Sequence, residues 1–149
     1  PELYREHFRM LRDGLTQFRR DNHWLRMRLP SGRFLVSLQP KIESRGMSYM
    51  GLSRYTRQWG RVFTHGGKLS GIGTQAFASD VLRYNMQHVE DHGYDIVLTV
   101  HDEAITEAPD DPSFNAPHLA QLMARAAPWA PNLPLAADGF EAYRYRKDD

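Results

Sequence analysis

The stretch that most constrains the fold is residues 95–107, which read DIVLTVHDEAITE. Apolar and β-branched residues fill both of its halves, and His101, Asp102 and Glu103 separate them. Two strand-like runs joined by a short polar break are typical of a β-hairpin. A hairpin tip would hold the two acids on a rigid frame, and hard divalent cations prefer carboxylate oxygens as ligands. The stretch therefore predicts a hairpin whose Asp102 binds a metal ion.

Length and composition limit the class of protein. The chain has 149 residues, which predicts a single domain over residues 1–149. It has no apolar run of 18 residues and no signal-peptide pattern, so no membrane partner is expected. It also has no cysteine, which excludes disulfides and thiolate metal sites and fits the reducing cytoplasm.

Charge is divided unevenly along the chain. Residues 1–68 hold 14 basic and 5 acidic side chains, whereas residues 69–149 hold 5 basic and 13 acidic ones. The two parts therefore carry formal charges of +9 and −8. This division predicts a polyanion-binding surface in the first part and a cation-binding centre in the second. The alternative is that the two parts neutralise each other across an interface.

The pattern of apolar residues predicts an α+β fold. Helices are expected over residues 1–22, 52–61, 74–92 and 116–127, and strands over the hairpins 25–38 and 95–107 and over residues 133–137. In the third helix Thr74 would be the N-cap and Gly93 the stop signal. An antiparallel sheet that contains the 95–107 hairpin would pack against this helix.

Basic and aromatic residues alternate in the middle of the chain. Arg54, Arg57 and Arg61 would share one side of the short 52–61 helix, and Lys68 follows it. Four aromatic residues stand among them, namely Tyr49, Tyr55, Trp59 and Phe63. Basic groups bind phosphates and aromatic rings stack on bases, so this region predicts a nucleic-acid surface. The alternative is that the aromatic residues belong to the core.

Several segments together resemble a known family. They are LPSGR at 29–33, THGGKL at 64–69, TQAFASDVL at 74–82, IVLTVHDE at 96–103 and LPLAADG at 133–139. In this order they resemble the C-terminal third of family A DNA polymerases, especially the phage and prophage branch. The resemblance covers nearly the whole chain. The resemblance implies that the chain is the C-terminal portion of a polymerase palm domain. It also implies that the protein works in a bacterial cell or a phage-infected host.

The resemblance implies a role for each matching residue. Asp102 would be one of two aspartates that hold a catalytic pair of Mg²⁺ ions, and Glu103 would support that site. His101 and Gln75 would contact the primer terminus and the minor groove of the newest base pairs. Arg54, Arg57, Arg61 and Lys68, which their charge and spacing indicate rather than the resemblance, would bind the DNA backbone. Primer–template DNA and deoxynucleoside triphosphates would be the partners.

Plainer interpretations of these residues stay open. Gln75 could be an ordinary residue of the first helical turn, His101 could only orient the neighbouring carboxylate, and Glu103 could be a solvated acid. The resemblance is also imperfect, because Gly71 and Ile72 stand where the family has an asparagine.

The family's first metal-binding aspartate and its fingers helix have no counterpart in this sequence. The chain is therefore expected to be the closing segment of a polymerase, inactive without the remaining polymerase segments as partners. Two other functions compete with this one. The chain could be a non-catalytic DNA-binding or accessory module that keeps the palm fold, or an unrelated metal-dependent hydrolase that uses His101, Asp102 and Glu103 together with outside ligands.

Overall fold

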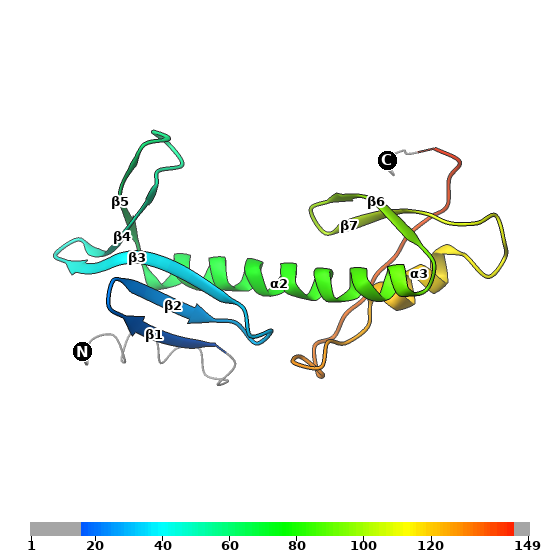
Figure 1. Cartoon of the computed structure of the whole chain (residues 1–149), viewed down its shortest axis with the longest axis horizontal. Coiled ribbons are helices and arrows are strands. Elements are labelled where there is room, and N and C mark those ends of the chain that lie inside the picture. Colours follow the sequence, from blue (N-terminus) through cyan, green and yellow to red (C-terminus); the bar gives the residue numbers. More distant parts are fainter. Residues whose placement is uncertain (1–15, 145–149) are drawn as a thin grey trace. The chain divides into compact units, whose positions relative to one another are not determined.

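A computed structural model of the chain describes residues 16–144. In chain order the elements are β1 (Gln17–Asp21), β2 (Trp24–Arg28), β3 (Phe34–Glu43), β4 (Gly46–Leu52), β5 (Trp59–Thr64), α2 (Gly66–Asp91), β6 (Asp95–Val100), β7 (Glu103–Glu107) and α3 (Ala116–Met123). Antiparallel strands and helices occupy separate stretches of the chain (Figure 1), so the predicted α+β class is confirmed.

The chain divides into two compact units. The first comprises residues 1–77, the second comprises residues 78–149, and helix α2 runs from one into the other. We call them unit 1 and unit 2 and describe each by itself. The prediction of a single domain over residues 1–149 stays a prediction.

Unit 1 contains a five-stranded antiparallel sheet in the order β1-β2-β3-β4-β5. The predicted 25–38 hairpin is confirmed as β2 and β3, which pair from Trp24↔Leu38 to Arg28↔Phe34. Gly32 lies in the turn at φ +88, a conformation that glycine adopts without strain, and its N–H donates to the Leu29 carbonyl at 2.9 Å. Gly32 and this hydrogen bond therefore stabilise the turn locally.

The helix predicted over residues 1–22 is wrong at its end. Residues 17–21 form strand β1, which pairs with β2 along its whole length, from Gln17↔Arg28 to Asp21↔Trp24. A two-residue turn at Asn22 and His23 connects them, and Asn22 has φ +49, where asparagine is favoured. Pairing with β2 satisfies the backbone here, and Phe18 packs on the core. The rest of that prediction lies outside the described residues.

The short helix predicted over residues 52–61 is also wrong. These residues end β4, turn, and begin β5, with Leu52↔Trp59 as the last pair before the loop. The arginines therefore do not share a helical face. The spacing of Arg54, Arg57 and Arg61 is helical, but the strand-forming residues on either side decide the structure by pairing with each other.

Helix α2 begins eight residues before the predicted start. The N–H of Lys68 donates to Nδ1 of His65 at 3.3 Å, and the N–H of Leu69 donates to the His65 carbonyl at 3.1 Å. His65 thus caps the helix. Thr74, the predicted cap, lies inside the helix and donates its hydroxyl to the Ser70 carbonyl at 3.1 Å.

The predicted end of this helix is confirmed. It ends at Asp91, and Gly93 follows at φ +86.

The core of unit 1 lies between the sheet and the first half of α2. Met27, Leu29 and Leu69 are buried there, and Leu35, Met47 and Ala76 are among the residues that pack on them. A Cβ at Gly73 would lie only 3.1 Å from Sδ of Met27. Because Gly73 has no Cβ, the helix can lie close to the sheet and pack on it. This packing stabilises a helix in a segment that is rich in glycine.

Unit 2 has a separate core formed by Val89, Tyr94 and Leu122. Helix α3 begins where predicted, because the Asn115 side chain caps it by accepting the N–H of His118 at 2.9 Å. It ends at Met123, earlier than residue 127. The predicted strand over residues 133–137 is wrong, since this described segment has no regular secondary structure.

The 95–107 hairpin is confirmed as β6 and β7. The two strands form a separate two-stranded sheet in unit 2. From the sequence, the hairpin is expected to be part of a larger antiparallel sheet. Ile96 packs on the core of this unit. Among residues 16–144, no helix combines the length and the apolar character needed to span a membrane.

Candidate metal and nucleic-acid sites

The tip of the β6–β7 hairpin carries the predicted acids. Val100 pairs with Glu103, so His101 and Asp102 form a two-residue turn between the strands. His101 has φ +57, a left-handed conformation that histidine adopts more readily than most residues. His101, Asp102 and Glu103 are all exposed. The hairpin thus brings these three residues together and leaves the Asp102 carboxylate accessible to a ligand.

The hairpin tip fits part of a metal site. Carboxylate oxygens are suitable ligands for Mg²⁺, which is commonly bound through one or two carboxylates plus substrate phosphates. Across residues 16–144, however, no group of three or more His, Cys, Asp or Glu residues could hold a metal ion. Asp102 and Glu103 can therefore supply ligands, but the remaining ligands must come from elsewhere.

Charge follows the division into two units. The described part of unit 1 holds 11 basic and 2 acidic residues, whereas that of unit 2 holds 3 basic and 11 acidic ones. The formal charges are thus +9 and −8. In unit 1, Asp21 pairs with Arg26 at 3.4 Å. The field around the hairpin tip in unit 2 therefore attracts cations, and that of unit 1 attracts polyanions.

Another acid of unit 2, Asp111, stabilises a turn. Asp111 lies in the exposed loop after β7 and accepts hydrogen bonds from the hydroxyl and the N–H of Ser113. These two bonds, the hydroxyl first, hold the pKa of the Asp111 carboxyl below its ordinary value. Asp111 is therefore a turn-forming residue.

Gln75 lies at an exposed position of α2 within unit 1. Its predicted place in the first turn of the helix is wrong, because α2 begins at Gly66. The hairpin residues His101, Asp102 and Glu103 belong to unit 2. Its contact with the primer stays a prediction.

The four predicted DNA-backbone residues are all in unit 1, on three different elements. Arg54 and Arg57 are exposed in the β4–β5 loop, Lys68 is exposed in the first turn of α2, and Arg61 lies on β5. Arg61 donates from Nη1 to the Gln39 carbonyl at 2.7 Å. This bond holds one guanidinium nitrogen on the irregularity in strand β3.

Two features of unit 1 are not predicted from the sequence. One is the exposure of large side chains around the β4–β5 loop, where Tyr55 is 96% exposed. The helical spacing of the arginines concealed this loop, although Ser53 and Thr56 are turn-forming residues that could have indicated it.

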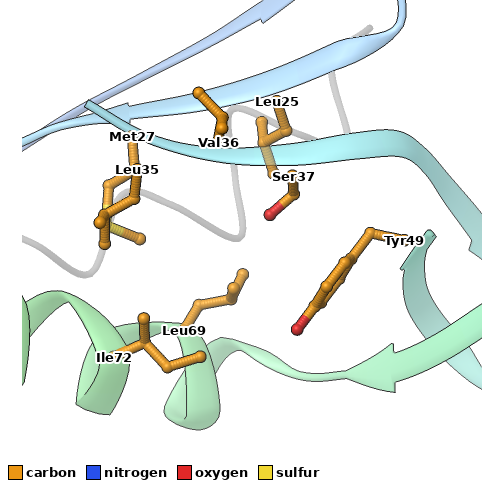
Figure 2. Close-up of a pocket in the computed structure, with 8 residues that line it drawn as sticks. All are labelled: Leu25, Met27, Leu35, Val36, Ser37, Tyr49, Leu69 and Ile72. Atoms are coloured by element: carbon orange, nitrogen blue, oxygen red, sulfur yellow. The ribbon is translucent and has the colours of Figure 1, made fainter. Parts of the chain in front are cut away.

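The other is an apolar pocket of about 190 Å³ between the sheet and α2 (Figure 2). It is lined by Leu25, Met27, Leu35, Val36, Ser37, Tyr49, Leu69 and Ile72. Its lining has no carboxylate, histidine or lysine, and Tyr49 is the only lining residue with an ionisable side chain.

A comparison with known proteins bears on the function. The chain is 36% identical over 144 residues to a protein of Bacillus phage SP02 named DNA polymerase. The chain is similar to part of a phage DNA polymerase. The alignment covers 93% of this chain and 22% of the SP02 protein, so the chain spans less than a quarter of that relative. This confirms the resemblance to phage DNA polymerases. No family model matches the chain, and no solved structure does.

Proposed function

We propose that this chain is a segment of a DNA-directed DNA polymerase and that its β6–β7 hairpin supplies a catalytic carboxylate, Asp102. The observation that carries the proposal is the similarity to the SP02 DNA polymerase over 93% of the chain. The exposed carboxylate at a hairpin tip supports it, because a metal-dependent transfer needs an accessible acid on a rigid element.

The proposed chemistry is nucleotidyl transfer to a primer 3′-hydroxyl. A pair of Mg²⁺ ions would supply charge stabilisation of the attacking and leaving oxygens. Asp102 would hold this pair together with a carboxylate from another polymerase segment, and Glu103 would support the site. One carboxylate cannot offset the repulsion between two divalent ions. We therefore propose that activity requires the remaining segments.

The proposed partners are primer–template DNA and deoxynucleoside triphosphates. Arg54, Arg57 and Lys68 are exposed in the basic unit and would bind phosphates. Arg61, already anchored to Gln39, would present its other nitrogens with less loss of side-chain entropy. His101 and Gln75 would contact the primer end and the minor groove. The reaction would take place in the cytoplasm of a bacterial cell or a phage-infected host.

A chimeric enzyme tests the proposal. In it, this chain replaces the matching segment of the SP02 polymerase, and primer extension is measured with Mg²⁺ and the four nucleotides. We expect extension, and we expect Asp102→Ala to lower its rate by about 10⁴-fold, a typical loss for removal of a catalytic group. Binding of primer–template should persist, because Asp102 is not in the basic unit.

Asp110→Ala is the matched control, since Asp110 is an exposed acid in the loop that follows the hairpin. It should leave extension unchanged. If the Asp102→Ala chimera extends primers at the rate of the unmutated chimera, the assignment of Asp102 is wrong. If the unmutated chimera binds primer–template but does not extend it, the non-catalytic DNA-binding function is favoured instead.

A further inference from the structure

The loop between β4 and β5 exposes large side chains at its tip. Tyr55 is 96% exposed, and Leu52 and Trp59, which pair with each other at the base of the loop, are 61% and 64% exposed. We call residues 52–59 the β4–β5 tip. Exposed large apolar side chains gathered in one place indicate a binding surface rather than a contribution to the fold.

The tip is ordered by its own hydrogen bonds. The N–H of Ser53 donates to the Gln58 carbonyl and the N–H of Arg57 to the Ser53 carbonyl, each at 2.9 Å. The hydroxyl oxygens of Ser53 and Thr56 accept two further N–H groups within the loop. Arg57 adopts φ +53, which these bonds hold in place. A ligand would therefore meet a preorganised surface, which reduces the entropic cost of binding.

The charge of the tip indicates the chemistry of its ligand. Residues 52–59 contain Arg54 and Arg57, both exposed, and no acidic residue. The described part of unit 1 has only two acids, Asp21 and Glu43, and neither belongs to the tip. The tip thus combines uncompensated positive charge with exposed aromatic rings, a combination that suits nucleic acid.

We propose that the β4–β5 tip binds an unpaired stretch of nucleic acid, with bases stacked on Tyr55 and Trp59 and phosphates held by Arg54 and Arg57. Aromatic side chains can stack on bases whose faces are free, whereas the bases inside a duplex already stack on one another. The aromatic part of the tip therefore selects single strands. This inference rests on the proposed function, and it specifies which part of the polymerase's DNA the tip contacts.

The test compares two DNA ligands on the full 149-residue chain. Fluorescence anisotropy measures the affinity for a labelled single strand of about 12 nucleotides, within the range that such sites cover, and for a blunt duplex of the same sequence. We expect Tyr55→Ala and Trp59→Ala each to weaken single-strand binding by about 5- to 150-fold. Duplex affinity should not change. Tyr55→Phe should bind like the unmutated chain because it keeps the ring.

Two further variants make the test specific. Trp24→Ala removes an aromatic residue that is 39% exposed on β2, outside the tip, and should leave single-strand affinity unchanged. The Arg54→Ala, Arg57→Ala double variant should reduce the slope of log affinity against log salt by about 1.4, because each phosphate neutralised on a single strand contributes about 0.7 to that slope. The two arginines and the two rings can thus be assigned separately.

The outcomes separate this inference from the proposed function. If Tyr55→Ala and Trp59→Ala bind the single strand like the unmutated chain, or lose duplex affinity equally, the inference about the tip is overturned. The Asp102→Ala result in the chimera would still stand. Conversely, selective loss of single-strand binding would support the tip even if the chimera failed to extend primers.

Discussion

The two units differ in the size of their sheets, in their formal charge and in the residues that their hairpin tips expose. Unit 1 is a five-stranded sheet covered by a helix, with a formal charge of +9 over its described residues and a hairpin tip that exposes aromatic rings. In the described residues of unit 2 the sheet is a two-stranded hairpin, the formal charge is −8, and carboxylates are exposed at the hairpin tip. The two hairpin tips thus expose residues of opposite charge, the basic Arg54 and Arg57 in unit 1 and the acidic Asp102 and Glu103 in unit 2.

The cores of the two units also differ. In unit 1 the sheet packs directly on α2 through Met27, Leu29 and Leu69. In unit 2 a helix-based core includes Tyr94, whose hydroxyl lies 3.0 Å from Nδ1 of His118 and accepts the N–H of Asn115 at 3.1 Å. An isolated two-stranded hairpin is only marginally stable. The β6–β7 hairpin therefore depends on packing of the kind that Ile96 provides.

The largest expected effect on stability concerns the core of unit 1. Leu29 is 2% exposed, so Leu29→Ala should lower the free energy of unfolding by about 2–5 kcal/mol. Urea denaturation measures this loss, and hydrogen exchange locates it. We expect amides of β2 and β3 to lose more protection than those of β6 and β7. Leu52→Ala, at a 61% exposed position, is the control and should change stability by less than about 0.5 kcal/mol.

Equal loss of protection in both units would contradict the division of the chain into two compact units.

A smaller effect tests how α2 approaches the sheet of unit 1. A Cβ at Gly71 would meet no atom within 4 Å, so Gly71→Ala should raise the free energy of unfolding by about 0.5–1 kcal/mol through helix propensity. Gly73→Ala gains the same propensity but crowds the buried Met27, so we expect little gain or a loss. Thermal denaturation of the two variants measures the difference. Equal stabilisation by both would mean that Gly73 has no packing role.

The sequence predicted the site hairpin better than its surroundings. Residues 95–107 contain their own strand pattern and turn, so local chemistry decides the structure and the location of Asp102. The 25–38 hairpin is predictable for the same reason, with Gly32 in its turn. The start of α2 could not be predicted, because four glycines discourage a helix there, and packing of Leu69 on the sheet and the cap from His65 stabilise it.

The exposure of the β4–β5 tip could not be predicted from composition. Aromatic residues such as Tyr55 and Trp59 fit a core or a surface equally well, and only the pairing of β4 with β5 decides between them. The sequence indicates that Arg54, Arg57 and Arg61 could bind phosphates. Their helical spacing suggests a helix, however, so the sequence does not indicate the exposed loop that carries Arg54 and Arg57.

The most direct test of the central claim is a metal titration of the full chain followed by nuclear magnetic resonance. Mn²⁺ prefers the same oxygen ligands as Mg²⁺ and broadens the signals of nearby amides through its unpaired electrons. Asp102 and Glu103 supply only some of the ligands, so this binding should be weak and need Mn²⁺ in excess over the chain. We predict that broadening is strongest at residues 101–103, is weak or absent in β1 to β5, and disappears from the hairpin in Asp102→Ala but not in Asp110→Ala. Broadening of the hairpin that persists in Asp102→Ala, or that centres on residues 110–111, would contradict the claim that Asp102 is a metal-binding carboxylate.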